Sequence, residues 1–309
     1  MRGLSLPRSG DRRLGGTARS SQTGLPGTGG PVMREDRDVR FLRVGVAGLL
    51  PQLRQELVAL LGSLSAPEWE LATSCPGWSV HDVAAHLLGV DVGNVSVRRD
   101  GWALGPGPDE NLDVWIDEFN QQWVGAARRI SPALLVELID LAGRRFEEHV
   151  AGLDLDAIGG PVQWAIKEAP APVWLDIARE YMERYVHQDQ IRRACRRPPL
   201  GRRLTEPVLA TAVHALPLAL ADVSRPAGTV VAFIAGDGGH EVAWYLTRAR
   251  GEWELGRSAP AGPADCELRT TIDGAIQSLV RDPAAPPLTW RGDPELAQAV
   301  SRAKAILGQ

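Results

Sequence analysis

The chain has 309 residues, of which 44% are hydrophobic and 23% are charged, with a formal net charge of −4. This apolar content suffices for a sizeable core, and we expect more than one domain. The weakly negative charge argues against a nucleic-acid-binding surface. His214 and Pro217 interrupt the longest apolar run, which leaves it short of the roughly 18 residues that a membrane span requires. Three scattered cysteines without a CxxC motif argue against a disulfide framework and predict a cytoplasmic location.

Residues 1–40 differ in composition from the rest of the chain. They contain eight glycines and eight arginines against four acidic residues, with few apolar residues among them. Such a segment cannot bury enough apolar surface to order itself, and we predict a disordered tail. Met33 lies where the composition changes, so starts of translation at Met1 and at Met33 are both open.

The next segment, residues 41–200, shows helical spacing of its apolar residues. Two capping-box signatures mark helix starts, one formed by Ser65 and Glu68 and the other by Ser79 and Asp82. The expected long helices cover residues 50–64, 79–97, 112–130, 132–150 and 173–195. Long helices with short to medium connections predict a four-helix bundle.

Two apolar stripes predict helix faces that pack into the core. The stripe on the helix over residues 79–97 consists of Val83, Leu87, Val90 and Val97. The stripe on the helix over residues 112–130 consists of Trp115, Phe119 and Trp123. Aromatic side chains at a spacing of four form packing surfaces far more often than cofactor sites.

After residue 205 the pattern changes to a smaller α+β domain, which we predict over residues 205–309. A helix-like stretch at residues 207–222 comes first. Expected strands at 229–235, 241–248, 252–256 and 266–271 are separated by glycine- and proline-rich turns, and helices are expected at 273–280 and 294–307.

Glu183 and His187 are the first candidates for a metal site. Their spacing of four places both side chains on one helix face, where they can present a carboxylate oxygen and an imidazole nitrogen to one divalent ion. A third ligand from another helix would complete the set. Asp176, Glu180 and Gln190 share this side of the helix, so a solvated polar face is the alternative interpretation.

His86 is a separate candidate for a metal ligand. It lies at the edge of the apolar stripe that Val83, Leu87 and Val90 form, which places it near the interior of the bundle. A core histidine with a satisfied hydrogen bond is the alternative at this position. Cys75, in the loop before this helix, is more typical of a small buried residue than of a reactive thiol.

The segment Cys-Pro-Gly-Trp-Ser at residues 75–79, followed by His86 on the same helix, resembles the N-terminal domain of the mycothiol-dependent maleylpyruvate isomerase family. That family belongs to the DinB/YfiT-like metal-binding four-helix bundles. Its second signature is a Glu-x-x-x-His pair, which Glu183 and His187 match. The resemblance covers Val44–Pro199.

The C-terminal part, which includes Trp290–Leu296, is similar to the α+β domain that accompanies the bundle and to sterol carrier modules. The resemblance therefore implies a mixed fold: a DinB-like four-helix bundle followed by this smaller domain.

The resemblance also implies a divalent metal, usually zinc, at His86, Glu183 and His187, with mycothiol as the thiol cosubstrate. Such an ion lowers the pKa of a thiol that binds to it, so the resemblance implies a thiol-using isomerase or S-transferase that acts on a small electrophilic acid. Arg281 and Arg291 are candidates for contacts to the substrate carboxylate, with solvated surface arginines as the alternative.

Two other functional classes stay open. One is a metal-dependent hydrolase in which water replaces the thiol, and the other is a non-catalytic module that binds a metal or a ligand. The sequence specifies neither the electrophile, the thiol nor the oligomeric state, and a set of two histidines and one carboxylate suits zinc, iron, nickel and manganese.

Overall fold

The structure is a computed structural model that describes residues 41–102, 105, 111–167 and 169–305. The predicted tail over residues 1–40 and the alternative start at Met33 lie outside the described residues. Within the described ranges, no helix is long and apolar enough to cross a membrane.

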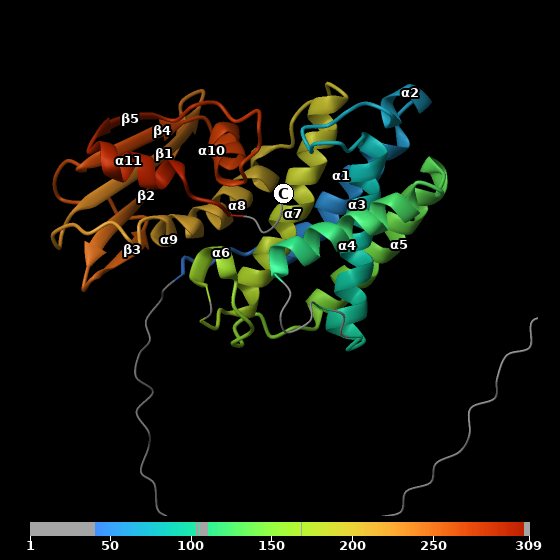
Figure 1. Ribbon diagram of the computed structural model, residues 1–309, viewed down its shortest axis with the longest axis horizontal. Helices are drawn as coiled ribbons and strands as arrows, with labels where there is room; N and C mark the ends of the chain where they lie inside the picture. The colour runs from blue at the N-terminus through green and yellow to red at the C-terminus, as the bar shows by residue number, and fades with distance from the viewer. Residues whose placement is uncertain (1–40, 103–104, 106–110, 168, 306–309) are drawn as a thin grey trace, which may run out of the picture. The chain divides into compact units, whose positions relative to one another are not determined.

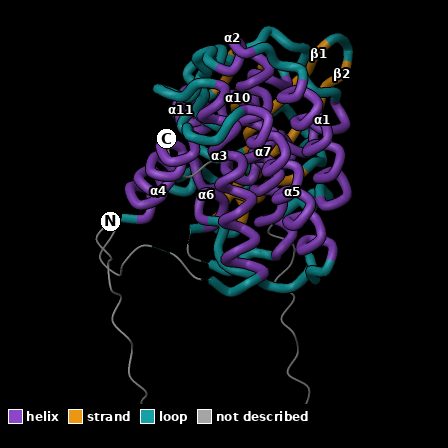
Figure 2. The backbone as a smooth tube through the Cα atoms, turned by 90° about the vertical axis from the view of Figure 1, so that its right-hand side faces the viewer, coloured by secondary structure: helices purple, strands orange, loops and turns teal. Residues whose placement is uncertain are grey.

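The described part of the N-terminal segment contains a four-helix bundle. It consists of α1 (Leu50–Gly62), α3 (Val80–Asn94), α5 (Pro132–Ala151) and α7 (Val173–Ala194), with α1 and α3 each in contact with both α5 and α7 (Figures 1 and 2). A further helix, α4 (Leu112–Ala127), packs against α3. The predicted bundle is therefore confirmed, and α7 is the helix that carries Glu183 and His187.

The described residues of the N-terminal segment also form four shorter elements. They are the 3-10 turn η1 (Ala47–Leu49), α2 (Ala66–Trp69), the π-helical turn η2 (Val95–Arg99) and α6 (Gln163–Ile166). The π-helical turn continues directly from α3, so the predicted helix over residues 79–97 changes its geometry after Asn94.

Both predicted capping boxes are present. The Ser79 hydroxyl accepts from the Asp82 backbone N–H, and the Asp82 carboxylate accepts from the Ser79 backbone N–H. Ser65 and Glu68 form the same arrangement at the start of α2. These reciprocal bonds satisfy backbone N–H groups that have no partner within the helix.

The two predicted apolar stripes are only partly buried. Val97 is 43% exposed because it lies in η2, beyond the part of α3 that faces the bundle. Phe119 is 40% exposed, since α4 buries only Val124 and Ala127, near its C-terminal end. The Phe119 ring stacks on Trp115 with a centroid separation of 5.0 Å. The prediction that these stripes are core faces is thus wrong for Val97 and Phe119.

In the described C-terminal residues, the strands form a five-stranded sheet of order β3-β2-β1-β4-β5. The strands are β1 (Val230–Asp237), β2 (His240–Ala249), β3 (Glu252–Gly256), β4 (Cys266–Thr270) and β5 (Thr289–Gly292). All neighbouring pairs are antiparallel except β1 and β4, which are parallel. Four strands match the predicted runs, and β5 was not predicted.

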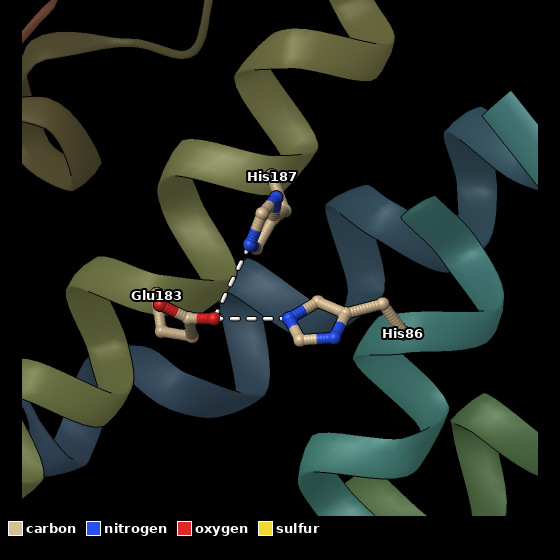
Figure 3. Close-up of side chains that lie close together, drawn as sticks. All are labelled: His86, Glu183 and His187. Carbon is tan, nitrogen blue, oxygen red and sulfur yellow. Dashed lines mark hydrogen bonds and ion pairs between the residues drawn. The ribbon is translucent and has the colours of Figure 1, made fainter. Parts of the chain in front are cut away.

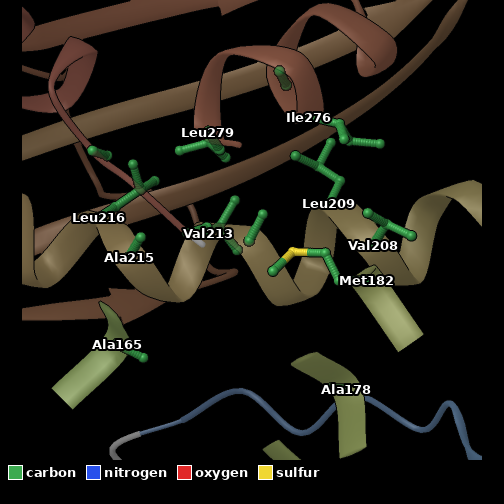
Figure 4. Packing of buried hydrophobic residues seen from close by; sticks show 14 of the residues in the cluster. Ala165, Ala178, Met182, Val208, Leu209, Val213, Ala215, Leu216, Ile276 and Leu279 are labelled. Atoms are coloured by element: carbon green, nitrogen blue, oxygen red, sulfur yellow. The ribbon is translucent and has the colours of Figure 1, made fainter. Parts of the chain in front are cut away.

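Helices from the C-terminal part connect the sheet to α7. Three short helical elements follow α7 in the chain and precede the first strand: α8 (Arg202–Ala212), η3 (Val213–Ala215) and α9 (Leu216–Ala219). Two further helices, α10 (Ile272–Leu279) and α11 (Pro294–Ser301), pack on the sheet. Figure 4 shows buried residues of α8, η3 and α9 that lie between Met182 of α7 and Ile276 of α10. A hydrophobic core thus runs from the bundle into the sheet, and the domain boundary between residues 200 and 205 stays a prediction.

Candidate metal centre

His86, Glu183 and His187 come together between α3 and α7 (Figure 3). The Nε2 atoms of His86 and His187 lie 3.0 and 3.2 Å from the same carboxylate oxygen, Glu183 Oε1. The two imidazole rings meet edge to face, with centroids 4.7 Å apart. Among the described residues, this is the group of histidine, cysteine and carboxylate side chains whose spacing suits a metal ion.

The centre lies inside the bundle rather than on a solvated face. His86 and His187 are each 5% exposed, and the Glu183 side chain is 19% exposed. Glu180 and Gln190, which the alternative interpretation placed on a solvated face, are each 2% exposed. That interpretation is therefore wrong: this polar side of α7 is buried because α3 packs against it.

Burial and charge shift the pKa values of the three groups in different directions. Burial lowers the pKa of His86. Burial also disfavours a charged His187, but the negative charge of Glu183 outweighs it and raises the pKa of His187 to about 10. Burial acts to raise the pKa of Glu183, yet the two imidazoles hold it well below its usual value. Glu183 is thus a carboxylate, and positive charge is favoured beside it.

The donor atoms fit a divalent ion. Two imidazole nitrogens and one carboxylate oxygen form a ligand set that zinc accepts, and all three atoms lie within 4.8 Å of one another. Ligands of a tetrahedral zinc ion at about 2.1 Å are separated by about 3.4 Å, which follows from that geometry. The observed separations of 3.0 and 3.2 Å from Glu183 Oε1 are close to this value.

A second layer of hydrogen bonds supports His187. Its Nδ1 atom lies 2.8 Å from Gln190 Oε1, and the Cys75 thiol donates to the same oxygen at 3.0 Å. Cys75 is buried, as predicted for a small residue in this loop. The sequence interpretation missed the role of Gln190, although its spacing of three from His187 places the two side chains near each other on a helix.

A network of charges lies one helical turn from the centre. The buried Glu180 carboxylate accepts from Asn94, Arg98, Arg179 and Arg184. Burial acts to raise the pKa of Glu180, but the neighbouring guanidinium groups lower it overall. These bonds join α7 to α3 and η2, and they hold the backbone that carries Glu183.

A cavity of about 740 Å³ lies beside the centre, between the loop before α3 and the turn between α4 and α5. Cys75 and Trp78 line this cavity, and both also contact the centre. The Trp78 and His86 rings lie 5.1 Å apart, and Cys75 Sγ lies 3.8 Å from His187 Nδ1. The three clustered side chains do not themselves line the cavity.

The two candidate arginines lie in the C-terminal part. Arg291, on β5, has a side chain that is 78% exposed and pairs with Glu267. Arg281, which follows α10, is exposed and donates to the backbone oxygen of Ser301. The described hydrogen bonds of Arg281 and Arg291 are to Ser301 and Glu267, and not to the metal centre. The role of the two arginines in binding a substrate carboxylate therefore stays a prediction.

Comparison with known proteins agrees with the motifs. Residues 50–192 match the family of mycothiol maleylpyruvate isomerase N-terminal domains. The fold is similar to a crystal structure of a mycothiol-dependent maleylpyruvate isomerase, with a TM-score of 0.51 and 10% sequence identity over 79% of this chain and 90% of that chain. A crystal structure of a mutant of such an isomerase gives a TM-score of 0.49 with the same identity and coverage. No curated protein matches the chain. The three clustered side chains all lie within residues 50–192, the part of the chain that is similar to the mycothiol maleylpyruvate isomerase N-terminal domains.

Proposed function

We propose that this protein is a metal-dependent enzyme that uses mycothiol as its cosubstrate and acts on a small electrophilic acid. Its reaction is isomerisation, as for maleylpyruvate, or transfer of the thiol. His86, Glu183 and His187 hold the divalent ion, and we propose zinc because it binds two imidazole nitrogens and one carboxylate oxygen in known catalytic sites. We place the enzyme in the cytoplasm.

One observation carries this proposal: two buried imidazole Nε2 atoms face a single oxygen of Glu183, at 3.0 and 3.2 Å. Burying a carboxylate and two imidazoles together has an energetic cost that a purely structural core would avoid with apolar residues. A divalent ion at this point favours the thiolate form of a thiol that reaches it.

The residues of the chain hold and enclose the reaction site. The Glu183 carboxylate offsets part of the positive charge of the ion. The hydrogen bonds that Glu180 accepts fix the turn of α7 that carries Glu183. Trp78 and Cys75 line the cavity of about 740 Å³ and also lie close to His86 and His187, which supports an approach of small molecules from that side.

The test measures turnover of maleylpyruvate, and of other α,β-unsaturated acids, by zinc-loaded protein with and without added mycothiol. We expect turnover that requires the thiol and is abolished in His187→Ala, because the ion then loses one of its three ligands. Tyr185→Phe is the matched control, since it removes one buried hydrogen bond from the same helix, to Thr205, without contact to the centre.

Three results would contradict the proposal. Turnover without a thiol would favour the hydrolase, and equal turnover by wild type and His187→Ala would exclude a role for the centre. Absence of thiol-dependent turnover across the set of unsaturated acids would favour the non-catalytic module.

A further inference from the structure

Gln190 occupies a buried position on α7 where its side-chain oxygen meets two donors. His187 Nδ1 lies 2.8 Å from Gln190 Oε1, and Cys75 Sγ lies 3.0 Å from the same atom. Gln190 is 2% exposed and Cys75 is 8% exposed. This three-residue arrangement lies on the side of His187 opposite to the Nε2 atom that faces Glu183.

The contact with Gln190 selects one form of the His187 ring. An amide oxygen only accepts hydrogen bonds, so Nδ1 must carry the proton that it donates. A neutral imidazole with its proton on Nδ1 has its lone pair on Nε2. In the metal-free protein a protonated Nε2 donates to Glu183 Oε1, 3.2 Å away. A bound ion would replace that proton and take the Nε2 lone pair, while the proton on Nδ1 stays in its bond to Gln190.

The Cys75 thiol fixes the orientation of the Gln190 amide. If the amide were reversed, its NH₂ group would face Nδ1, which would then have to accept, and the ring proton would move to Nε2. The S–H group of Cys75 is buried and donates to the amide oxygen at 3.0 Å, which favours the orientation in which that oxygen faces His187. Cys75 comes from the loop before α3, so this bond also joins the loop to α7.

We propose that Gln190 is a positioning residue for the metal centre: held by the Cys75 thiol, its oxygen keeps the His187 proton on Nδ1 and leaves Nε2 free to bind the ion. The inference rests on the proposed metal site and adds a residue that acts on the ion only through His187. Hydrogen-bond partners of this kind raise metal affinity by roughly 10- to 100-fold in other proteins.

The experiment compares full-length wild type with three variants. Zinc affinity is measured by competition with a chromophoric chelator, and the proton position on His187 is read from the ¹⁵N shifts of its two ring nitrogens in the zinc-loaded protein. Gln190→Leu keeps a similar size but removes the acceptor, whereas Gln190→Glu keeps an acceptor. Tyr185→Phe on the same helix is the control for loss of one buried hydrogen bond.

We expect zinc to bind Gln190→Leu at least roughly tenfold more weakly than wild type, and Gln190→Glu to recover most of the loss. Tyr185→Phe is expected to bind zinc like wild type. In wild type, the NMR spectrum should show the proton on Nδ1 and the metal on Nε2.

Unchanged zinc affinity in a folded Gln190→Leu would overturn this inference alone, while the metal site itself would stand. A His187 proton on Nε2 in zinc-loaded wild type would overturn it as well, and this measurement needs no variant to fold. A wild type that binds no zinc would overturn both the inference and the proposed function.

Discussion

At the scale of single residues, local spacing predicts some residues of the metal centre, whereas others are brought there by packing between distant helices. Glu183 and His187 were predicted as a pair because a helix brings residues four apart onto one face. His86 lies 97 positions from Glu183, so its place in the set came from the family resemblance and not from periodicity. The alternative that placed Gln190 on a solvated face is wrong, because α3 packs against that side of α7 and local spacing does not show this contact.

Asp82 allows a prediction at this scale. Its side chain accepts from the Ser79 backbone and pairs with Arg128. Burial acts to raise the pKa of Asp82, but the bonds from Arg128 and Ser79 lower it overall. A carboxyl with a lowered pKa in the folded state stabilises the protein above its unfolded pKa of about 3.9, and this stability is lost as the pH falls through the folded pKa.

We therefore expect Asp82→Asn to lower the free energy of unfolding by about 1 kcal/mol at pH 7, and the difference from wild type to shrink as the pH falls below about 4 and to vanish below the folded pKa of Asp82. Urea denaturation of both proteins across this pH range measures the difference in their free energies of unfolding. Asp113→Asn, in the exposed first turn of α4, is the control and should have little effect. A difference for Asp82→Asn that stays constant down to about pH 2 would contradict the assignment.

At the scale of elements, the sequence predicted most helices and strands because they have strong local signals. Capping boxes marked the starts of α2 and α3, and glycine turns separated the first strands. β5 has no such signal: its four residues are all exposed, and it is a strand only because it pairs with β4, as in the partners Leu268 and Trp290. Pairing of this kind joins distant segments and is invisible to local periodicity.

The contact between α3 and α4 gives a prediction at this scale. A Cβ atom at Gly89 would lie 2.6 Å from Trp123 Nε1, which now donates to the Ala85 backbone oxygen at 2.8 Å. Gly89→Ala should therefore displace Trp123 and destabilise the protein by about 1–3 kcal/mol, in spite of a gain of about 1 kcal/mol in helix propensity.

Gly93→Ala on the same helix is the matched control, because no atom lies within 4 Å of its added Cβ. It should stabilise the protein by up to about 1 kcal/mol. The comparison is made from the midpoints of urea denaturation of Gly89→Ala and Gly93→Ala, each measured relative to wild type. Equal stabilisation by both substitutions would show that Trp123 does not pack against Gly89 as described.

At the scale of the whole molecule, the loop beside the centre is tied to the C-terminal part. The buried Asp282 carboxylate, which follows α10, accepts from Ser74 in that loop and from Arg193 at the end of α7. The sequence predicted the α+β composition of the C-terminal part but not this connection, since a hydrogen bond over 208 positions leaves no local pattern.

The central claim is that His86, Glu183 and His187 bind a divalent ion. Elemental analysis tests it most directly, on protein purified without a chelator or a metal-affinity tag, together with a His86→Ala, His187→Ala double variant. We expect stoichiometric divalent metal in the wild type and none in the variant, with circular dichroism showing that the variant is folded. Absence of metal from wild type even after incubation with zinc, or equal metal in both proteins, would contradict the account.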